Sequence, residues 1–598
     1  MKKSLMLSAC MAALLASPAL AVVPSSGSNT STVTQAGDHQ TATINQTGNN
    51  DASSTDQSNA NNTVLVNQSG KKGSSSTVKQ SGTLGSATVT QTDDGSGTKP
   101  VATSSIDQQG ATDIATVDQF SQVAGAKNAS TITQVGSFNT AGVIQRSSGQ
   151  TSSITQNSDN NTALVLQGDA LLTSNTGNTT TLLQGGTGNN FAEVHQEQGA
   201  NGTATINQLG DTGYAYVVQF NGSGNVATID QFGLNDQATA ESVGSGNTIK
   251  IKQVQDNNET TTLQTGDNNI SNVNQLKTTP TAPFYTVAPV TDGQNNAEVT
   301  QTGNLNRSDV DQNGFQGILT VVQTGNSNYA KSSQEGRLGV IRVEQTGNSN
   351  ESYWDQSVSS RRANFTPFNF LFGVFQQGNS NISHVTQTGY GIFGSYGTAN
   401  QVFYGNTYPV HNDVLVEQLG NSNQSTINQG GGNPVLGTAG ANFNDAEAFQ
   451  LGNGNMSQID QIGTNDYAEV DQGLNGEGFD PGAVINASFG SSSTVTQSGR
   501  TDALIVHQGG STHASTVTQS GNGDTGYVVQ AGSLNTSTLT QSGNNDLATV
   551  LQLGSLNIST LTQSGNGNDA DVQQASIGNF SSATQAGNNG SVVVIQNH

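Results

Sequence analysis

Short segments that alternate hydrophobic and polar residues recur along almost the whole chain. In Ser537-Thr538-Leu539-Thr540-Gln541, the first, third and fifth residues share one face of an extended chain, and the two threonines share the other. This period of two, in a segment bounded by polar and glycine residues, predicts a short, half-buried β-strand. The same cadence returns in many other segments, so the pattern predicts an all-β fold.

The strand pattern is locked to an internal repeat. From Gln497 to Gln596 each segment ends in a glutamine, and successive glutamines are always eleven residues apart. The fuller motif reads A/S-x-V/I/L-x-Q-x-G-x-x-N, in which the glycine opens a turn. Two such units make a strand–turn–strand of 22 residues. Repeats of this kind stack on one another. We therefore predict a β-solenoid of stacked two-strand rungs, with 22 residues per rung and parallel, in-register, amyloid-like sheets.

The inward glutamines are the candidate functional residues. A buried amide is costly unless it is paired, and identical amides stacked in register can bond along the stack, as they do in amyloid. We expect the arc asparagines to form ladders as well, and the glycines to supply positive φ. The predicted ladder residues are Gln134, Asn139, Gln145, Gln264, Asn269, Gln301, Asn306, Gln312, Gln323, Asn328, Gln334, Gln345, Asn350, Gln530, Asn535, Gln541, Gln552, Asn557, Gln563, Asn568, Gln574, Gln585 and Gln596. The predicted turn glycines are Gly136, Gly303, Gly325, Gly347, Gly532, Gly543, Gly554 and Gly565.

The chain begins with the pattern of a secretory signal peptide. Lys2 and Lys3 precede an apolar run, and Ala19 and Ala21 form a small-residue cleavage site. The predicted organisation is a signal peptide (1–21), a short leader (22–30), repeats (31–275), a proline-containing insertion (276–295), repeats (296–356), aromatic-rich insertions with an interspersed repeat (357–417), and repeats (418–598) with insertions near 430–449 and 473–496. The final apolar segment, Val592 to Gln596, is expected to lack a cap.

Prolines provide an independent test of the repeat. Proline cannot donate a hydrogen bond to a sheet, so it should be absent from interior strands. In the expected mature chain the prolines fall in the leader or where the eleven-residue count breaks: Pro24, Pro100, Pro280, Pro283, Pro289, Pro367, Pro409, Pro434 and Pro481. The two aromatic insertions, which include Phe365 to Phe375 and Tyr390 to Tyr408, are expected to be loops that cover a side of the solenoid or form a docking patch.

Composition and charge narrow the function. Hydrophobic residues make up only 32% and charged residues 10%, which is typical of disordered chains. A disordered chain, however, has no reason to keep a constant spacing between repeated residues. A net charge of −24 argues against nucleic acid and anionic membranes as partners. The only cysteine, Cys10, lies in the signal peptide, so no disulfide is expected.

No catalytic, metal or cofactor site is expected from the sequence. It contains no recognisable Ser-His-Asp set, metal-spaced His/Cys motif or phosphate-binding loop, so an enzyme is not expected. Val-Asp-Gln triplets, which end at Gln119, Gln312 and Gln472, place acids on the outward face. A solvated acidic face accounts for them better than weak calcium binding does.

The repeat resembles the curlin repeat of curli amyloid subunits, whose pattern pairs S-x5-Q-x-G-x-x-N-x-A-x3-Q. The residues that carry the resemblance include Ser559, Gln563, Gly565, Asn568, Ala570 and Gln574. The resemblance implies a secreted subunit of extracellular amyloid fibres from a Gram-negative bacterium. It also implies export through a dedicated outer-membrane channel, with nucleator or accessory subunits as partners.

Three functions are open at this point. The first is a structural subunit that polymerises into the fibres of a biofilm matrix and mediates adhesion and cohesion. The second is a monomeric surface adhesin whose insertions bind a ligand. The third is an ice-binding protein, because threonines such as Thr538 and Thr560 form outward columns at the repeat spacing.

Overall fold

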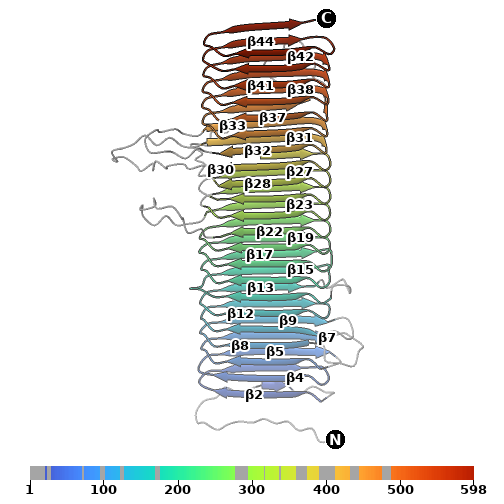
Figure 1. Ribbon diagram of the computed structural model, residues 1–598. Helices are drawn as coiled ribbons and strands as arrows, with labels where there is room; N and C mark the ends of the chain where they lie inside the picture. Colours follow the sequence, from blue (N-terminus) through green and yellow to red (C-terminus); the bar gives the residue numbers. More distant parts are fainter. Residues whose placement is uncertain are drawn as a thin grey trace, which may run out of the picture. The chain divides into compact units, whose positions relative to one another are not determined.

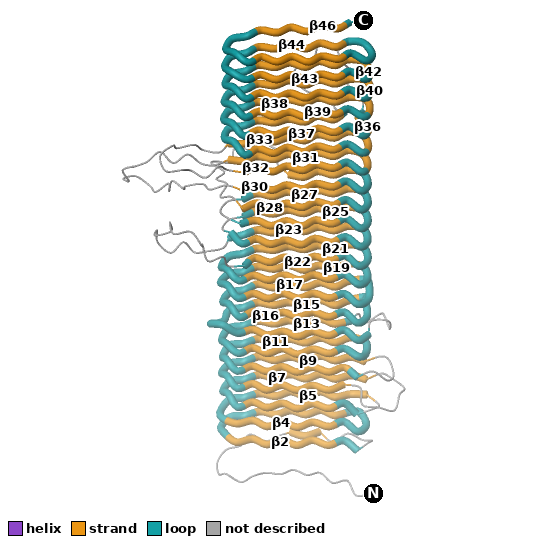
Figure 2. Tube along the Cα trace, viewed as in Figure 1, coloured by secondary structure: helices purple, strands orange, loops and turns teal. Residues whose placement is uncertain are grey.

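The computed structural model describes residues 20–22, 28–70, 73–93, 102–121, 127–168, 176–276, 294–314, 317–335, 339–357, 373–388, 411–430, 443–473 and 487–597. These residues form β-strands and connecting arcs, and every strand pairing between them is parallel. Figure 2 shows the strands joined by loops at their ends. The prediction of an all-β solenoid is confirmed.

The chain divides into two compact units, residues 1–294 and 295–598. Each unit consists of two parallel sheets, and successive strands along the chain alternate between them, so that the strands pile up one above another (Figure 1). Alternation arises because each arc carries the chain from one sheet to the other. One rung is therefore a strand from each sheet.

In the first unit, one sheet contains the odd-numbered strands β1 (Leu20–Val22), β3 (Thr41–Gln46), β5 (Thr63–Gly70), β7 (Ser86–Asp93), β9 (Ile114–Ser121), β11 (Thr140–Arg146), β13 (Thr162–Gln167), β15 (Phe191–Glu197), β17 (Tyr214–Phe220), β19 (Gln237–Val243) and β21 (Glu259–Thr265). The other contains β2 (Thr30–Ala36), β4 (Ala52–Ser58), β6 (Ser75–Gln80), β8 (Ala102–Gln108), β10 (Asn128–Gln134), β12 (Thr151–Gln156), β14 (Thr179–Gln184), β16 (Thr203–Gln208), β18 (Val226–Gln231), β20 (Thr248–Gln253) and β22 (Ile270–Gln275).

In the second unit, the first sheet contains β23 (Asn296–Thr302), β25 (Ile318–Thr324), β27 (Val340–Thr346), β29 (Gly373–Gln377), β31 (His411–Asn421), β33 (Phe443–Asn453), β35 (Tyr467–Gln472), β36 (Ser488–Phe489), β38 (Ala503–Ser511), β40 (Thr525–Ser533), β42 (Leu547–Ser555), β44 (Asp569–Gln574) and β46 (Ser591–Gln596). The second contains β24 (Arg307–Gln312), β26 (Tyr329–Gln334), β28 (Glu351–Ser357), β30 (Ile382–Thr388), β32 (Gln424–Gly430), β34 (Met456–Gln461), β37 (Ser492–Gln497), β39 (Ala514–Gln519), β41 (Thr536–Gln541), β43 (Ile558–Gln563) and β45 (Phe580–Gln585).

The core of each unit lies between its two sheets. In β41, Ser537, Leu539 and Gln541 are buried and the alternate residues are partly exposed, as the period of two predicts. The facing strand β42 contributes Ala548 and Val550, both with no exposed area. In this rung a small residue and a branched residue from each strand thus fill the space between the sheets, and the glutamine lies at one end of the core layer.

Insertions lengthen the connections without changing the register. Ladder glutamines are 22 residues apart between Gln301 and Gln323, but 31 apart between Gln345 and Gln376, and 42 apart between Gln376 and Gln418. Equivalent residues still pair, because sliding a strand by one position would turn its buried face outward. Strands β33 and β37 begin inside two of the ranges predicted to be insertions, 430–449 and 473–496.

Several sequence predictions fall outside the described residues. They include all prolines, most of the two aromatic insertions, most of the signal peptide with Ala19, and most of the leader. Ala21 lies in β1, which pairs with β3. Phe375 lies in β29, where it pairs with Glu344 and Glu417. Within the described parts of the chain, no helix is long and apolar enough to cross a membrane.

Candidate functional site: the stacked amides and turns

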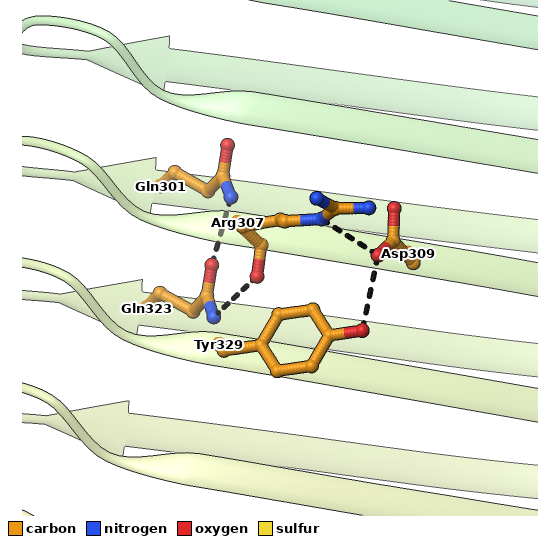
Figure 3. Close-up of polar contacts among 5 residues, drawn as sticks. All are labelled: Gln301, Arg307, Asp309, Gln323 and Tyr329. Atoms are coloured by element: carbon orange, nitrogen blue, oxygen red, sulfur yellow. Dashed lines mark hydrogen bonds and ion pairs between the residues drawn. The ribbon is translucent and has the colours of Figure 1, made fainter.

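The inward glutamines end the strands in both sheets, and nearly all are buried. Figure 3 shows the arrangement in the second unit: the Gln301 amide donates from Nε2 to Oε1 of Gln323 at 2.8 Å. Gln323 Nε2 donates in turn to the backbone carbonyl of Arg307, at 3.0 Å, and to Oε1 of Gln345, at 2.8 Å. Each amide therefore uses one N–H along the stack and one across to the facing sheet. This satisfies a group that would otherwise be costly to bury.

The same bond recurs at the other predicted glutamines, with Nε2–Oε1 distances between 2.8 and 3.1 Å. The pairs are Gln134–Gln156, Gln145–Gln167, Gln312–Gln334, Gln334–Gln356, Gln345–Gln376, Gln530–Gln552, Gln541–Gln563, Gln552–Gln574, Gln563–Gln585 and Gln574–Gln596.

One column is interrupted in the first unit. Ser242 pairs in register with Gln219 on one side and Gln264 on the other, and its short side chain cannot span the distance to the next amide. Gln264 keeps its bond across the rung, from Nε2 to the carbonyl of Thr248 at 3.1 Å. In the facing strand β20, two isoleucines, Ile249 and Ile251, fill the inward positions, whereas β19 contributes only Ala238 and Ala240.

The arc asparagines bond differently from the expectation of an amide-to-amide ladder. Asn306 accepts from the backbone N–H of Asn328 at Oδ1, and its Nδ2 donates to the carbonyl of Gly325 at 2.8 Å. The physical reason is that the backbone N–H and C=O groups of the turn are buried and need hydrogen-bond partners. The short asparagine side chain lies closer to these groups than to the next asparagine. Equivalent backbone bonds involve Asn139, Asn269, Asn328, Asn350, Asn535, Asn557 and Asn568.

A true asparagine ladder lies two residues earlier, on the exposed side of the turn. Nδ2 of Asn326 donates to Oδ1 of Asn348, and the column continues through Asn379, Asn421 and Asn453 at 3.1–3.2 Å. The sequence does contain a signal for it, the repeated Gly-Asn-Ser-Asn, whose first asparagine the eleven-residue motif leaves variable.

In four consecutive rungs the buried arc position is an aspartate: Asp466, Asp502, Asp524 and Asp546, all at most 1% exposed. Each Oδ1 accepts from the backbone N–H one rung further on, at 2.9–3.1 Å, whereas each Oδ2 has no hydrogen-bond partner. Burial, together with the charge of the next aspartate, raises the pKa of Asp466 to about 7 and the pKa values of Asp502 and Asp524 to about 6. We call these four residues the aspartate column.

The turn glycines are required by close approach of the backbone. A Cβ on Gly543 would lie 1.4 Å from the carbonyl oxygen of Gly565, and one on Gly325 would lie 1.9 Å from that of Gly347. Positive φ is found at Gly303, Gly325, Gly347, Gly532, Gly554 and Gly565, but not at Gly136 and Gly543. In all eight turns the residue two positions after the glycine has a left-handed φ, as Phe138 and Asn545 do in the two turns whose glycine does not. What all eight glycines share is a neighbouring backbone at the place of a side chain.

Rungs of this kind, with equivalent residues paired in parallel and polar side chains stacked along the axis, define a parallel β-solenoid built from sequence repeats. The model of the curlin associated repeat matches residues 199–233, 516–543 and 543–575, so these segments of the chain are similar to curlin repeats. None of the curated proteins compared with the chain matches it.

The family match bears on the kind of function. The curlin repeat family is a family of structural subunits, not of enzymes. The three matched segments include the glutamines Gln208, Gln231, Gln530, Gln552 and Gln563, so the family signal and the ladders coincide.

Proposed function

We propose that this protein is a secreted structural subunit that polymerises into extracellular amyloid fibres of a biofilm matrix, where it mediates adhesion and cohesion. The observation that carries the proposal is the chemical identity of successive rungs. Because glutamine pairs with glutamine and glycine lies over glycine in one rung after another, a rung of a second molecule fits as well as the next rung of the same chain.

The last described strands of the second unit offer a surface for such stacking. Strand β46 pairs only with β44 among the described residues, and its outward Val593 and Ile595 are 63% and 57% exposed. Gln596 accepts from Gln574 at 2.8 Å and donates to the carbonyl of Phe580, so one amide N–H remains to continue the ladder. Edge strands with unpaired backbone are templates for added strands.

A glycine column makes the proposal sharply testable. In Gly499, Gly521, Gly543 and Gly565, an added Cβ would collide with the carbonyl of the next glycine, at 1.4–2.0 Å. Gly587 occupies the same position in the arc between β45 and β46, and there an added Cβ has nothing within 4 Å. Gly587→Ala should therefore leave the folded subunit intact and clash only when a further rung is added.

The experiment is assembly of the chain from residue 22 onward, diluted from denaturant with and without fragments of preformed fibres. Dye fluorescence and electron microscopy follow growth, and fibre diffraction should show the cross-β spacing of about 4.7–4.8 Å. Gly587→Ala should reduce the elongation rate at least tenfold, whereas Ser582→Ala, which faces outward in β45, should elongate as wild type does.

Two results would overturn parts of the proposal. A stable, soluble monomer that ignores seeds would exclude a polymerising subunit and would favour the monomeric adhesin. Fibres in which Gly587→Ala elongates at the wild-type rate would show that subunits do not add to this end by rung stacking.

A further inference from the structure

A group of ionisable side chains lies together on the outward face of one sheet in the second unit. Glu447 on β33 pairs in register with Glu469 on β35, and Asp471 on β35 pairs with His507 on β38. Outward positions in neighbouring rungs lie one strand spacing apart, about 4.8 Å. Parallel stacking therefore brings together side chains that are distant in the sequence.

The donor atoms converge. His507 Nε2 lies 3.3 Å from Oδ2 of Asp471 and 3.7 Å from Oε1 of Glu469. One donor atom from each of the three residues lies within 4.8 Å of the other two. The Tyr467 hydroxyl donates to the second Glu469 oxygen, Oε2, at 2.7 Å, which holds that carboxylate in place with Oε1 toward the histidine.

The cluster contains one buried residue, Asp471, and two partly buried residues, Glu469 and His507, and it has little positive charge. Asp471 is only 3% exposed, its Oδ1 has no hydrogen-bond partner, and neither does Nε2 of His507. Among the described residues, the ion pairs of Glu469 and Asp471 are with His507 alone, so no lysine or arginine balances the carboxylates. Two carboxylates whose shared counter-ion is one histidine are unfavourable in a partly buried place, which favours the binding of a cation there.

We propose that Glu469, Asp471 and His507 bind one divalent transition-metal ion, with Zn²⁺ as the reference case. At metal–ligand distances of about 2.0–2.2 Å, neighbouring ligands of a tetrahedral site lie roughly 3.4 Å apart. The two separations from His507 Nε2, 3.3 and 3.7 Å, lie on either side of that spacing. An imidazole with carboxylates favours such an ion over Ca²⁺ or Mg²⁺, which prefer oxygen ligands alone.

A second histidine in the chain shows why this geometry is specific. His195 also lies near two carboxylates, but Glu193 approaches its Nε2 at 2.6 Å and Glu197 approaches its Nδ1 at 3.5 Å. The two carboxylates therefore lie against different ring nitrogens and cannot share one ion with a single nitrogen. At His507 both carboxylates face Nε2.

The ion would join rungs across an insertion. Gln472 and Gln508, the ladder glutamines of β35 and β38, are 36 residues apart instead of 22, so this is a place where the chain leaves the repeat between two paired strands. A metal bound to both strands would hold this enlarged rung in register.

The test is equilibrium dialysis of the full chain from residue 22 against Zn²⁺, together with the visible ligand-field absorption of added Co²⁺. The expected result is one ion per chain and a tetrahedral or five-coordinate Co²⁺ spectrum. Asp471→Asn and His507→Gln should each weaken binding at least tenfold, and His195→Gln, the matched control, should leave it unchanged. Circular dichroism verifies that the variants are folded.

Other outcomes would overturn the proposal. If wild type and His507→Gln bind Zn²⁺ equally, the ion is held by the diffuse acidic surface. If no Co²⁺ spectrum develops, the cluster is a histidine–carboxylate ion pair and not a metal site. Binding of Ca²⁺ as tight as that of Zn²⁺ would also contradict the assignment to a transition metal.

Discussion

At the scale of single residues, the inward glutamine combines three roles in one side chain. Gln541 accepts from Gln519 at 2.9 Å, donates to Gln563 at 3.0 Å, and donates across the rung to the carbonyl of Thr525 at 3.0 Å. No other uncharged side chain of this length supplies two donors and an acceptor. Glutamine therefore recurs because its partners above and below are glutamines.

This predicts the effect of removing one amide. Gln541→Ala should lower the free energy of unfolding by about 3 kcal/mol, because it leaves several buried groups without partners and opens a cavity. Thr540→Ala, the outward neighbour, should change it by less than about 0.5 kcal/mol. Denaturant titration of both variants measures the difference; equal effects would contradict a structural role of the ladder.

The aspartate column predicts a pH dependence. The pKa of Asp524 rises from 3.8 to about 6 in the folded chain, so the folded state binds a proton that the unfolded state has lost. The resulting stabilisation is complete below about pH 4 and is lost as the pH rises through about 6, by roughly 1–2 kcal/mol for this residue. Stability of the second unit should thus fall between pH 4 and pH 7.

Asp524→Asn isolates this effect. The amide can donate to a turn carbonyl, as Asn306 does to Gly325, so the variant should be more stable than wild type at pH 8 and similar to it at pH 4. Thr540→Ala, on the partly exposed outward face of β41, is the control, because it removes no ionisable group and should not alter the pH profile. A variant that is less stable at pH 8 would contradict the account.

At the scale of the strand and its arc, the turns tolerate residues that the backbone conformation disfavours. Leu556, which follows β42, has φ of 57° and is 53% exposed, so it adopts the left-handed conformation and buries little apolar area. Side chains other than glycine and asparagine adopt this conformation at a cost of about 1–2 kcal/mol.

Leu556→Asn should therefore raise the midpoint of chemical unfolding by the equivalent of about 1 kcal/mol. Leu547→Asn is a matched control, because Leu547 is 41% exposed and lies at the start of the same strand, with ordinary extended geometry. That control should be neutral or slightly destabilising. Stabilisation of both variants would show that the cause is the replacement of an exposed apolar side chain by a polar one, not the relief of backbone strain.

At the scale of the whole molecule, charge opposes association. The full chain has a net charge of −24, and without Lys2 and Lys3 of the predicted signal peptide each subunit has −26, so polymerisation brings like charges together. Salt shortens the range of this repulsion, from about 30 Å at 0.01 M to about 8 Å at 0.15 M. The lag time of assembly should thus shorten as NaCl rises from 10 to 150 mM. A lag time that lengthens with salt would indicate that attraction between opposite charges drives association.

The sequence by itself determined the architecture. A period of two fixes which side chains face inward, and the eleven-residue return of glutamine fixes which residues stack, because a ladder requires the same side chain in each rung. That is why the solenoid, the parallel register and the position of Gln541 above Gln563 could all be predicted without coordinates.

Only the tertiary structure decided how the turns and the outward faces are used. Asn306 bonds to the turn backbone instead of to the next asparagine. Gly543 is needed because the backbone of the next rung lies where a Cβ would be, not because of a positive φ. Both facts depend on the distance between stacked rungs, which the sequence does not give. The grouping of Glu469, Asp471 and His507 was equally hidden. An insertion in the chain separates His507 from the two carboxylates, and only the pairing of β35 with β38 brings the three side chains together.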